Sequence, residues 1–507
     1  MKSATPEKTT SSYSQILKSS SIIGGAQGIN YLISMLRVKL VAVLLGPAGI
    51  GLVGLYVSAT ELVGTISGLG ISTSGVREVA EAHGTGKAEH IARTVKTLRR
   101  ACWVTGFLGW MLCAALSYPL SVWTFGSGER TWAIVVLGAT ILITAVSGGQ
   151  SALIQGTRRI GDLARMGIIG ALTGTIIAVG LYAWLGQTGI VPVLIVTAAC
   201  NLGFSWWFAR KIPVASVSLT WPETFGNSKQ LVSLGLAFMY GALLSATLNL
   251  FIRGLIVREL GLDANGIYQA AWGISGMFAG FILGAMGTDY YPRLTAVAHD
   301  NDQVNRLVNE QIEVGALLAL PGLLGTLAFA PWLMHIFYSA KFLSGAELLP
   351  YAAVGVFGQV ITYPLGFVQR AKGKTGWIFI SQTHVNFLNF VLALVMIPPF
   401  GIVAAAWAFA LTTYIHGLVV FGIAHRLSNF ALTAQSARLL LSAAGIIGIG
   451  FAAQALTNGL VEFFLGVLIT VLGSLFSLRG ISSRLGTEHR VVKIVIKLPG
   501  GRTVCGL

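Results

Sequence analysis

The chain has 507 residues, of which 54% are hydrophobic and only 10% are charged, and its mean hydropathy is +0.75. Soluble domains carry about 25% charged residues, so this composition excludes an ordinary soluble protein and predicts a polytopic membrane protein. The formal net charge of +16 would suit a nucleic-acid-binding protein, but the distribution of the charge along the chain excludes that class, as the topology below indicates.

Membrane-spanning helices are expected wherever about 20 apolar residues lie between charged residues or Gly and Pro turns. Fourteen stretches of the sequence meet this description. We therefore predict an all-α polytopic membrane protein with about 14 transmembrane helices. The expected segments are 20–45, 49–74, 101–125, 131–154, 166–186, 189–209, 231–257, 265–291, 312–338, 346–369, 376–397, 401–424, 437–456 and 460–478.

The basic residues lie almost entirely on one side of this topology. With the N-terminus in the cytoplasm, twenty-eight of the 34 Lys and Arg residues fall in inner segments, and the outer loops hold only Arg130, Arg258 and Lys341. Cytoplasmic loops of membrane proteins carry such an excess of positive charge. The charge therefore indicates orientation, both termini are predicted to be cytoplasmic, and no nucleic-acid partner is expected.

The inner segment from Arg77 to Arg100 is the longest loop, and Ile91, Val95 and Leu98 recur in it at helical spacing. This pattern predicts a short amphipathic helix on the membrane surface. No outer segment is long enough for a soluble catalytic domain, and we find no phosphate-binding loop, metal-ligand cluster or nucleophile and base pair. We therefore expect a transporter without a metal or cofactor, and not an enzyme.

Two sequence patterns recur after about 215 residues. Residues 45–52 and 260–267 share Leu-Gly, four residues, Gly and an aliphatic residue, and residues 153–158 and 367–372 share a Gln with a basic residue three positions later. The first pair is separated by 215 residues and the second pair by 214. Each copy ends or connects the corresponding predicted helices, so an internal duplication is expected.

Each copy holds six predicted helices, and because six is even the second copy enters the membrane from the same side. The two copies are therefore predicted to be parallel repeats, an arrangement in which transporters bind substrate between the halves and alternate access by rocking. The predicted organisation is a cytoplasmic N-tail (1–19), an N-terminal six-helix lobe (20–228), a C-terminal six-helix lobe (229–426), two additional transmembrane helices (437–478) and a basic cytoplasmic tail (479–507).

Three cations lie inside the apolar segments: Arg37 and Lys39 in the first, and Arg253 in the seventh. A charge within hydrocarbon is costly, and such residues usually face a wet cavity or a partner. At the offset of 215, Arg253 corresponds to position 38. We expect these three residues to bind an anionic substrate. The alternative is that they only extend outward to the membrane interface.

Acidic residues in the apolar segments are few. Glu61 lies in the middle of the second segment and Asp289 near the inner end of the eighth. Either could be a counter-ion for the arginines or a site that takes up H⁺ or Na⁺, although Asp289 also suits an interfacial position. Polar residues in other segments are expected to hydrogen-bond between helices; they include Gln150, Gln155, Asn249, Gln269, Gln359, Gln382, His384, Asn386 and His416.

Several stretches resemble the polysaccharide-unit flippases. Residues 39–52, then Gly68-Leu-Gly-Ile71 and Gly75-Val-Arg-Glu-Val-Ala80, resemble the start of O-antigen and lipid III flippases of the multidrug/oligosaccharidyl-lipid/polysaccharide exporter superfamily, and Arg253 with residues 265–269 is also similar. The resemblance covers about residues 15–425. Members commonly have twelve helices, so the last two predicted helices depart from the pattern, whereas lipid II flippases carry fourteen.

This resemblance implies translocation of an undecaprenyl-pyrophosphate-linked oligosaccharide from the cytoplasmic to the periplasmic leaflet of the bacterial inner membrane. It implies membrane lipids as partners, and a polysaccharide polymerase with its chain-length machinery could be others. Three alternatives stay open: a lipid II-type peptidoglycan precursor flippase, a cation-coupled multidrug antiporter, and a membrane scaffold without transport activity. A scaffold would not need matched intramembrane cations, and a drug antiporter would favour an acidic or apolar cavity.

Overall fold

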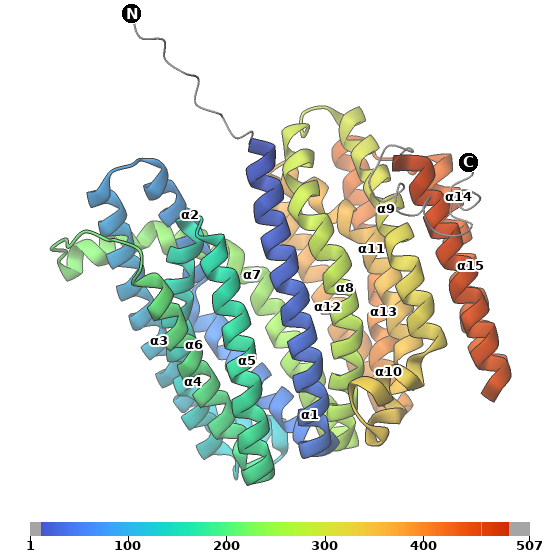
Figure 1. The fold of residues 1–507 in the computed structure, drawn as a ribbon, viewed down its shortest axis with the longest axis horizontal. Coiled ribbons are helices and arrows are strands. Elements are labelled where there is room, and N and C mark those ends of the chain that lie inside the picture. The colour runs from blue at the N-terminus through green and yellow to red at the C-terminus, as the bar shows by residue number, and fades with distance from the viewer. Residues whose placement is uncertain (1–11, 458, 486–507) are drawn as a thin grey trace, which may run out of the picture. The chain divides into compact units, whose positions relative to one another are not determined.

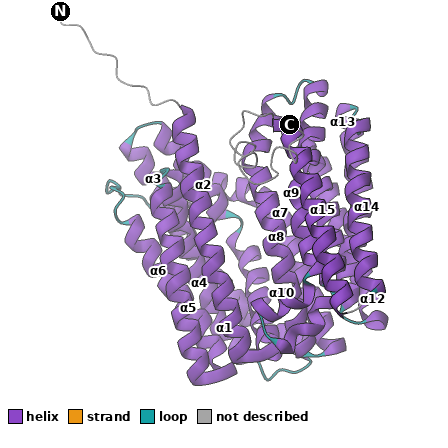
Figure 2. Ribbon diagram, turned by 45° about the vertical axis from the view of Figure 1, so that its right-hand side comes forward, coloured by secondary structure: helices purple, strands orange, loops and turns teal. Residues whose placement is uncertain are grey.

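The computed structural model of the chain describes residues 12–457 and 459–485 (Figure 1). Within these residues every regular element is a helix (Figure 2). Eleven helical stretches of the described residues are long and apolar enough to cross a membrane, and one of them, Ile160–Ala209, combines two successive helices. The predicted all-α polytopic class is confirmed, whereas the count of fourteen segments stays a prediction.

Contacts divide the chain into two compact units, with the boundary at Leu250 and Phe251 inside one helix. We call them unit 1 and unit 2. Unit 1 contains α1 (Ser12–Gly68), α2 (Ile71–Gly84), α3 (Ala88–Phe125), α4 (Thr131–Gly156), α5 (Ile160–Leu185), the 3-10 helix η1 (Gly186–Gly189), α6 (Ile190–Ala209) and most of α7 (Trp221–Leu260). The lobe boundary expected at 228/229 lies earlier in α7 and stays a prediction about the repeat.

Unit 2 contains the rest of α7 and eight further α-helices of the described residues. They are α8 (Leu262–Ala296), α9 (Asn301–Ala328), α10 (Ala330–Phe337), α11 (Leu349–Ala371), α12 (Thr375–Phe400), α13 (Val403–Ser428), α14 (Ala434–Leu456) and α15 (Gly459–Leu485), with the 3-10 helix η2 (Ala340–Glu347) between α10 and α11. Most of the predicted N-tail and of the basic tail lies outside the described residues.

The hairpin turn predicted to recur after 215 residues has the same backbone conformation in both copies. Gly46 divides α1 into two helical arms and has φ 66° and ψ −174°. Gly261 separates α7 from α8 and has φ 89° and ψ 173°. Only glycine adopts this region readily, because a Cβ atom would clash with the backbone. The repeat therefore places a glycine where each hairpin requires one.

The second recurrent pattern also marks an equivalent turn, but its register needs a correction. The N–H of Arg159 donates to the carbonyl of Ile154 at 3.0 Å after α4, and the N–H of Lys374 donates to the carbonyl of Gln369 at 2.9 Å after α11. A residue with positive φ precedes each donor, as in a Schellman motif. Equivalent residues are thus 215 apart and not 214, so Gln369 corresponds to Ile154 rather than to Gln155.

A third turn repeats at the same offset. The N–H of Gly186 donates to the carbonyl of Tyr182 after α5, and the N–H of Gly401 donates to the carbonyl of Ile397 after α12. Both glycines have positive φ, and both helices contain 26 residues. Three equivalent turns at one offset support the prediction of two parallel copies of one helical unit.

The inner segment that precedes residue 101 differs from the expectation. Leu69 and Gly70 have positive φ and end α1, α2 follows, and α3 then runs without a break from Ala88 to Phe125. Val95 and Leu98 are buried in a cluster with apolar side chains of α2 and α4. The prediction of a short helix on the membrane surface is therefore wrong, because the apolar face of this segment packs inside unit 1.

The connection between α6 and α7, residues 210–220, is fastened to the beginning of α3. Lys96 donates a hydrogen bond from Nζ to the carbonyl of Val217. Arg100 donates from Nη1 to the carbonyl of Leu219 at 2.9 Å. Two of the inner basic residues thus bind backbone oxygens of this connection, in addition to any role in orientation.

The two helices beyond the repeat, α14 and α15, pack on α9. Apolar side chains of α9 and α14 share one core cluster, and α15 adds an ion pair. The Glu313 carboxylate accepts hydrogen bonds from Ser436 Oγ of α14 and from Arg484 Nε of α15, both at 2.6 Å. Glu313 is only 7% exposed. A buried carboxylate is stable only with such partners, so this cluster holds the three helices together.

Candidate functional site

The intramembrane cation of unit 2 is held by its neighbours. Arg253 is half-buried in α7, and its Nη1 donates a hydrogen bond to Oε1 of Gln269 in α8. Its guanidinium carbon lies 5.8 Å from the ring centroid of Tyr268, within the range of a cation–π interaction. Tyr268 is 2% exposed and stacks on Trp272, with ring centroids 5.5 Å apart. The guanidinium is therefore oriented by an amide and an aromatic ring.

The pairing of Arg253 with Gln269 could have been found in the sequence. Each residue lies eight positions from Gly261, one before it and one after it. In two antiparallel helices joined by a tight turn, residues equally distant from the turn lie at the same depth, because both helices rise by about 1.5 Å per residue. The hydrogen bonding between helices predicted for Gln269 is confirmed.

The cations of unit 1 have a different environment. Arg37 is half-buried in α1, and its Nη1 lies over α5, 3.7 Å from the position that a Cβ atom of Gly174 would occupy. It also interacts electrostatically with Tyr182 of α5. No salt bridge of Arg37 occurs among the residues that the structure describes. Lys39, two residues further along α1, is half-buried as well.

Glu61 lines a separate cavity of unit 1. This cavity has a volume of about 400 Å³ and lies among the second arm of α1, α3 and α4. Glu61 is exposed and is the charged residue of the lining, which otherwise consists of Ser, Thr, Gly and apolar side chains. No salt bridge of its carboxylate occurs within the described part of the chain.

The hydroxyl groups of this cavity are predominantly acceptors. Thr60, Thr65, Thr105 and Thr144 each donate their hydroxyl hydrogen to a backbone carbonyl of their own helix, at 2.7–2.9 Å. The hydroxyl oxygens keep lone pairs that can accept further hydrogen bonds. Together with the Glu61 carboxylate they suit a cation, a proton or the hydroxyl hydrogens of a sugar, but not a phosphate.

The remaining predicted residues have mixed outcomes. Asp289 belongs to α8, but its side chain lies outside what the structure describes. His384 of α12 and His416 of α13 lie with their Nδ1 atoms 3.2 Å apart, and Gln150 of α4 accepts a hydrogen bond from Arg99 of α3 at 3.4 Å. The hydrogen bonding between helices predicted for these three polar residues is confirmed.

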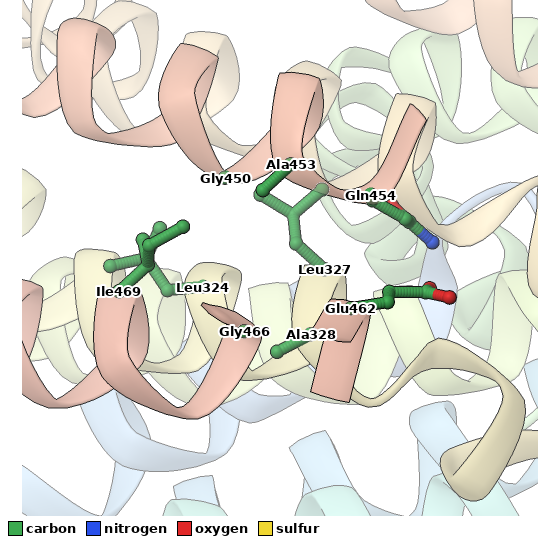
Figure 3. Close-up of a pocket in the computed structure, with 9 residues that line it drawn as sticks. All are labelled: Leu324, Leu327, Ala328, Gly450, Ala453, Gln454, Glu462, Gly466 and Ile469. Carbon is green, nitrogen blue, oxygen red and sulfur yellow. The ribbon is translucent and has the colours of Figure 1, made fainter. Parts of the chain in front are cut away.

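Unit 2 also has a small cavity where α14 and α15 meet α9 (Figure 3). Apolar residues such as Leu324, Leu327 and Ile469 line most of it, and Gln454 and Glu462 lie together at one end. Its volume of about 10 Å³ is close to the space that one water molecule needs. It is therefore too small for a transported headgroup.

Comparison with known families identifies the chain. A family model described as "Polysaccharide biosynthesis protein" matches residues 40–347, which is more than half of the sequence. The chain belongs to this family. The matched region begins next to Lys39 and includes Glu61, Arg253 and Asp289 among the predicted site residues.

Individual members and structures extend the match. The lipid III flippase of Escherichia coli (strain K12) is 24% identical over 401 residues, which cover 76% of this chain and 92% of that protein. The structure of the lipid II flippase MurJ in an inward closed conformation has a TM-score of 0.68 at 13% identity and covers 91% of this chain and 99% of its own. This polysaccharide biosynthesis family member therefore shares its fold with a flippase.

The same fold also occurs in drug transporters. An inward-facing multidrug resistance MATE family transporter of the MOP superfamily has a TM-score of 0.68 at 16% identity, covering 79% of this chain and 95% of its own. The fold is thus that of a membrane transporter and not of an enzyme. It does not choose between a lipid-linked substrate and a drug, so that choice depends on the site.

Proposed function

We propose that this protein is a flippase that moves an undecaprenyl-pyrophosphate-linked oligosaccharide from the cytoplasmic to the periplasmic leaflet of the bacterial inner membrane, with both termini in the cytoplasm. The observation that carries the proposal is the oriented guanidinium of Arg253, bound by Gln269 and facing Tyr268. The family match and the similarity to a lipid III flippase support the same substrate class.

The chemistry of the substrate fits these residues. A pyrophosphate carries negative charge that hydrocarbon excludes, and arginine binds phosphate oxygens through paired N–H groups. Arg37, Lys39 and Arg253 would bind the pyrophosphate or the first sugars during alternating access, while the polyprenyl tail stays in the lipid. A polysaccharide polymerase and its chain-length machinery would then receive the product at the outer leaflet.

The Glu61 cavity would have a separate role in energising transport. Its carboxylate lies among hydroxyl oxygens and would repel a phosphate, whereas it can bind H⁺ or Na⁺. Uptake of a cation at Glu61 would change the charge of unit 1 without changing that of the Arg253 site. Asp289 is the second candidate for this role.

The Glu61 cavity also favours a second candidate function, antiport of a cationic drug. A carboxylate among acceptor groups suits such a compound, and the MATE transporters share the fold. The two functions differ in what a deletion strain does. Loss of a flippase causes the lipid-linked oligosaccharide to accumulate with unchanged drug susceptibility, whereas loss of a drug antiporter raises susceptibility and leaves the glycolipid level unchanged.

The direct test is complementation in a strain that lacks its own flippase. Arg253→Ala is expected to abolish polysaccharide display while membrane levels of the protein stay normal. The matched control is Arg258→Ala, because Arg258 is exposed at the end of the same helix and should be dispensable. Normal display with Arg253→Ala would overturn the proposed role of Arg253.

A further inference from the structure

A second cationic cavity lies in unit 1, away from the residues already described. It has a volume of about 860 Å³ and is formed by α3, α4, α6 and the beginning of the connection to α7. Its polar lining consists of Arg99, Gln150 and Arg210, and its exposed aromatic lining of Trp103 and Trp206. No acidic residue belongs to this lining, so the cavity has a positive charge without an internal counter-ion.

Arg99 has donors that the protein does not use. It is half-buried, and its Nη2 donates a long hydrogen bond of 3.4 Å to Gln150 Oε1. Its Nε is buried and has no hydrogen-bond partner within the described residues. The neighbouring Lys96 and Arg100 differ, since both bind carbonyl oxygens of the connection between α6 and α7. A buried donor without an acceptor is costly, which indicates that an external acceptor occupies the cavity.

Arg210 supplies the second positive charge. It is exposed at the end of α6, and its guanidinium carbon lies 4.9 Å from the ring centroid of Trp206. This stacking holds the side chain extended beside the cavity and leaves its N–H groups available. Trp103 and Trp206 are 54% and 55% exposed, as is typical of the aromatic residues at membrane interfaces.

We propose that this cavity binds the phosphate headgroup of an anionic glycerophospholipid of the bilayer. Two guanidinium groups and one amide provide several donors to phosphate oxygens, and the two indole rings with Leu202 and Val146 provide apolar contact for the upper acyl chains. Basic pockets between transmembrane helices at the headgroup level bind anionic lipids in this way. The site is distinct from the residues proposed to bind the transported substrate, and the inference does not depend on that proposal.

The test measures lipid retention by the purified full-length protein in nanodiscs that contain equal amounts of phosphatidylglycerol and phosphatidylcholine, followed by native mass spectrometry. Wild-type protein is expected to retain phosphatidylglycerol preferentially. Because a hydrogen bond to a charged group contributes roughly 1.5–3 kcal/mol, each of Arg99→Gln and Arg210→Gln should lower this preference by about tenfold or more. The variant Arg99→Lys keeps the charge but loses the planar donor set, and should have an intermediate effect.

The matched control is Arg93→Gln. Arg93 lies on the same helix and is exposed, where it pairs with Glu89 at 3.0 Å, so its loss should leave the preference unchanged. Size-exclusion profiles and circular dichroism establish that each variant is folded. An unchanged preference in folded Arg99→Gln and Arg210→Gln would overturn the proposal.

Two further probes distinguish the sources of the phosphate. Undecaprenyl pyrophosphate and inorganic phosphate are each added to the phosphatidylglycerol complex. Retention of phosphatidylglycerol in the presence of both supports a bilayer lipid as the occupant. Displacement by an equimolar amount of undecaprenyl pyrophosphate would instead assign the cavity to the polyprenyl substrate, and displacement by inorganic phosphate would assign it to a soluble anion; either result contradicts the proposal.

Discussion

The two units follow the same helical path but treat their intramembrane cation differently. In unit 2, Arg253 donates to Gln269 and faces Tyr268. In unit 1, Arg37 extends over Gly174, a residue without a side chain. The backbone turns of the duplicated helices are preserved at a constant offset, whereas the side chains around the charges are not. The duplication therefore explains where the charges lie along the helices, and the surroundings determine how firmly each is oriented.

The largest expected effect comes from replacing each arginine by lysine. Lysine keeps the positive charge but lacks the planar donor set and stacks less well on an aromatic ring. Arg253→Lys should therefore lower transport roughly a hundredfold, corresponding to about 2.7 kcal/mol, whereas Arg37→Lys should retain most of it. The measurement is the rate at which lipid-linked oligosaccharide becomes accessible on the outer leaflet of vesicles. Equal sensitivity of the two sites would contradict the difference between the units.

A second difference is the pair of helices attached only to the second copy. Removing the carboxylate with Glu313→Ala leaves Arg484 without its partner, and Arg484 is one-fifth exposed. We expect a loss of roughly 3 kcal/mol, near the lower end of the range for breaking a buried ion pair. Thermal melting of the purified protein measures the change. Arg93→Ala in unit 1, which removes an exposed ion pair, is the control and should shift the melting temperature little.

The hairpin glycines test the equivalence of the two copies. A side chain in the backbone region of Gly46 and Gly261 costs roughly 1–3 kcal/mol, and neither glycine has another atom within 4 Å of the position of a Cβ. Gly46→Ala and Gly261→Ala should thus lower the melting temperature by similar amounts through backbone strain alone. Gly180→Ala is the control, since it has free space and no positive φ. A markedly unequal response of the two hairpins would show that the turns are not energetically equivalent.

The smallest effect concerns the helices α3 and α9, which follow the first hairpin of each copy. Asp300 caps α9 by accepting hydrogen bonds from the N–H groups of Asp302 and Gln303, whereas Lys87 precedes α3 without such a cap. The hydrogen bond from Gln303, followed by its side-chain amide, holds the pKa of Asp300 below its ordinary value. The capping carboxylate therefore stabilises α9 above the ordinary carboxyl pKa of about 4.

This stabilisation is lost as the pH falls through the lower pKa that Asp300 has in the folded protein. Asp300→Asn keeps a capping group without a titrating carboxyl, so it should reduce the fall in melting temperature between neutral and acidic pH. Lys87→Gln should leave the acid dependence unchanged. An identical acid dependence of Asp300→Asn and the wild type would exclude this carboxyl as a contributor.

Much of the fold was predictable because it depends on local composition. Apolar length located the helices, and the recurrent Leu-Gly pattern located Gly46 and Gly261, since the hairpin requires a glycine there. The register of the second pattern was predicted one residue wrong, because a shared Gln outweighed the turn geometry. The path of residues 88–100 was also missed, since an amphipathic face can pack on protein as well as on lipid.

The candidate site divides in the same way. The pairing of Arg253 with Gln269 follows from equal distances to a turn and was available from the sequence. The contact of Arg37 with Gly174 and the ion pair of Glu313 with Arg484 join helices that are far apart in the chain. Such contacts depend on which helices become neighbours, and no local pattern contains that information.

The fastening of residues 210–220 by Lys96 and Arg100 has a consequence for biogenesis. Basic residues retain a segment in the cytoplasm while the helices insert one after another. These two find their final acceptors, the carbonyls of Val217 and Leu219, more than a hundred positions later in the chain. They therefore serve first as orientation signals for α3 and then, after α6 has been synthesised, as donors that lock the connection. Completion of unit 1 is in this respect a late event of translation.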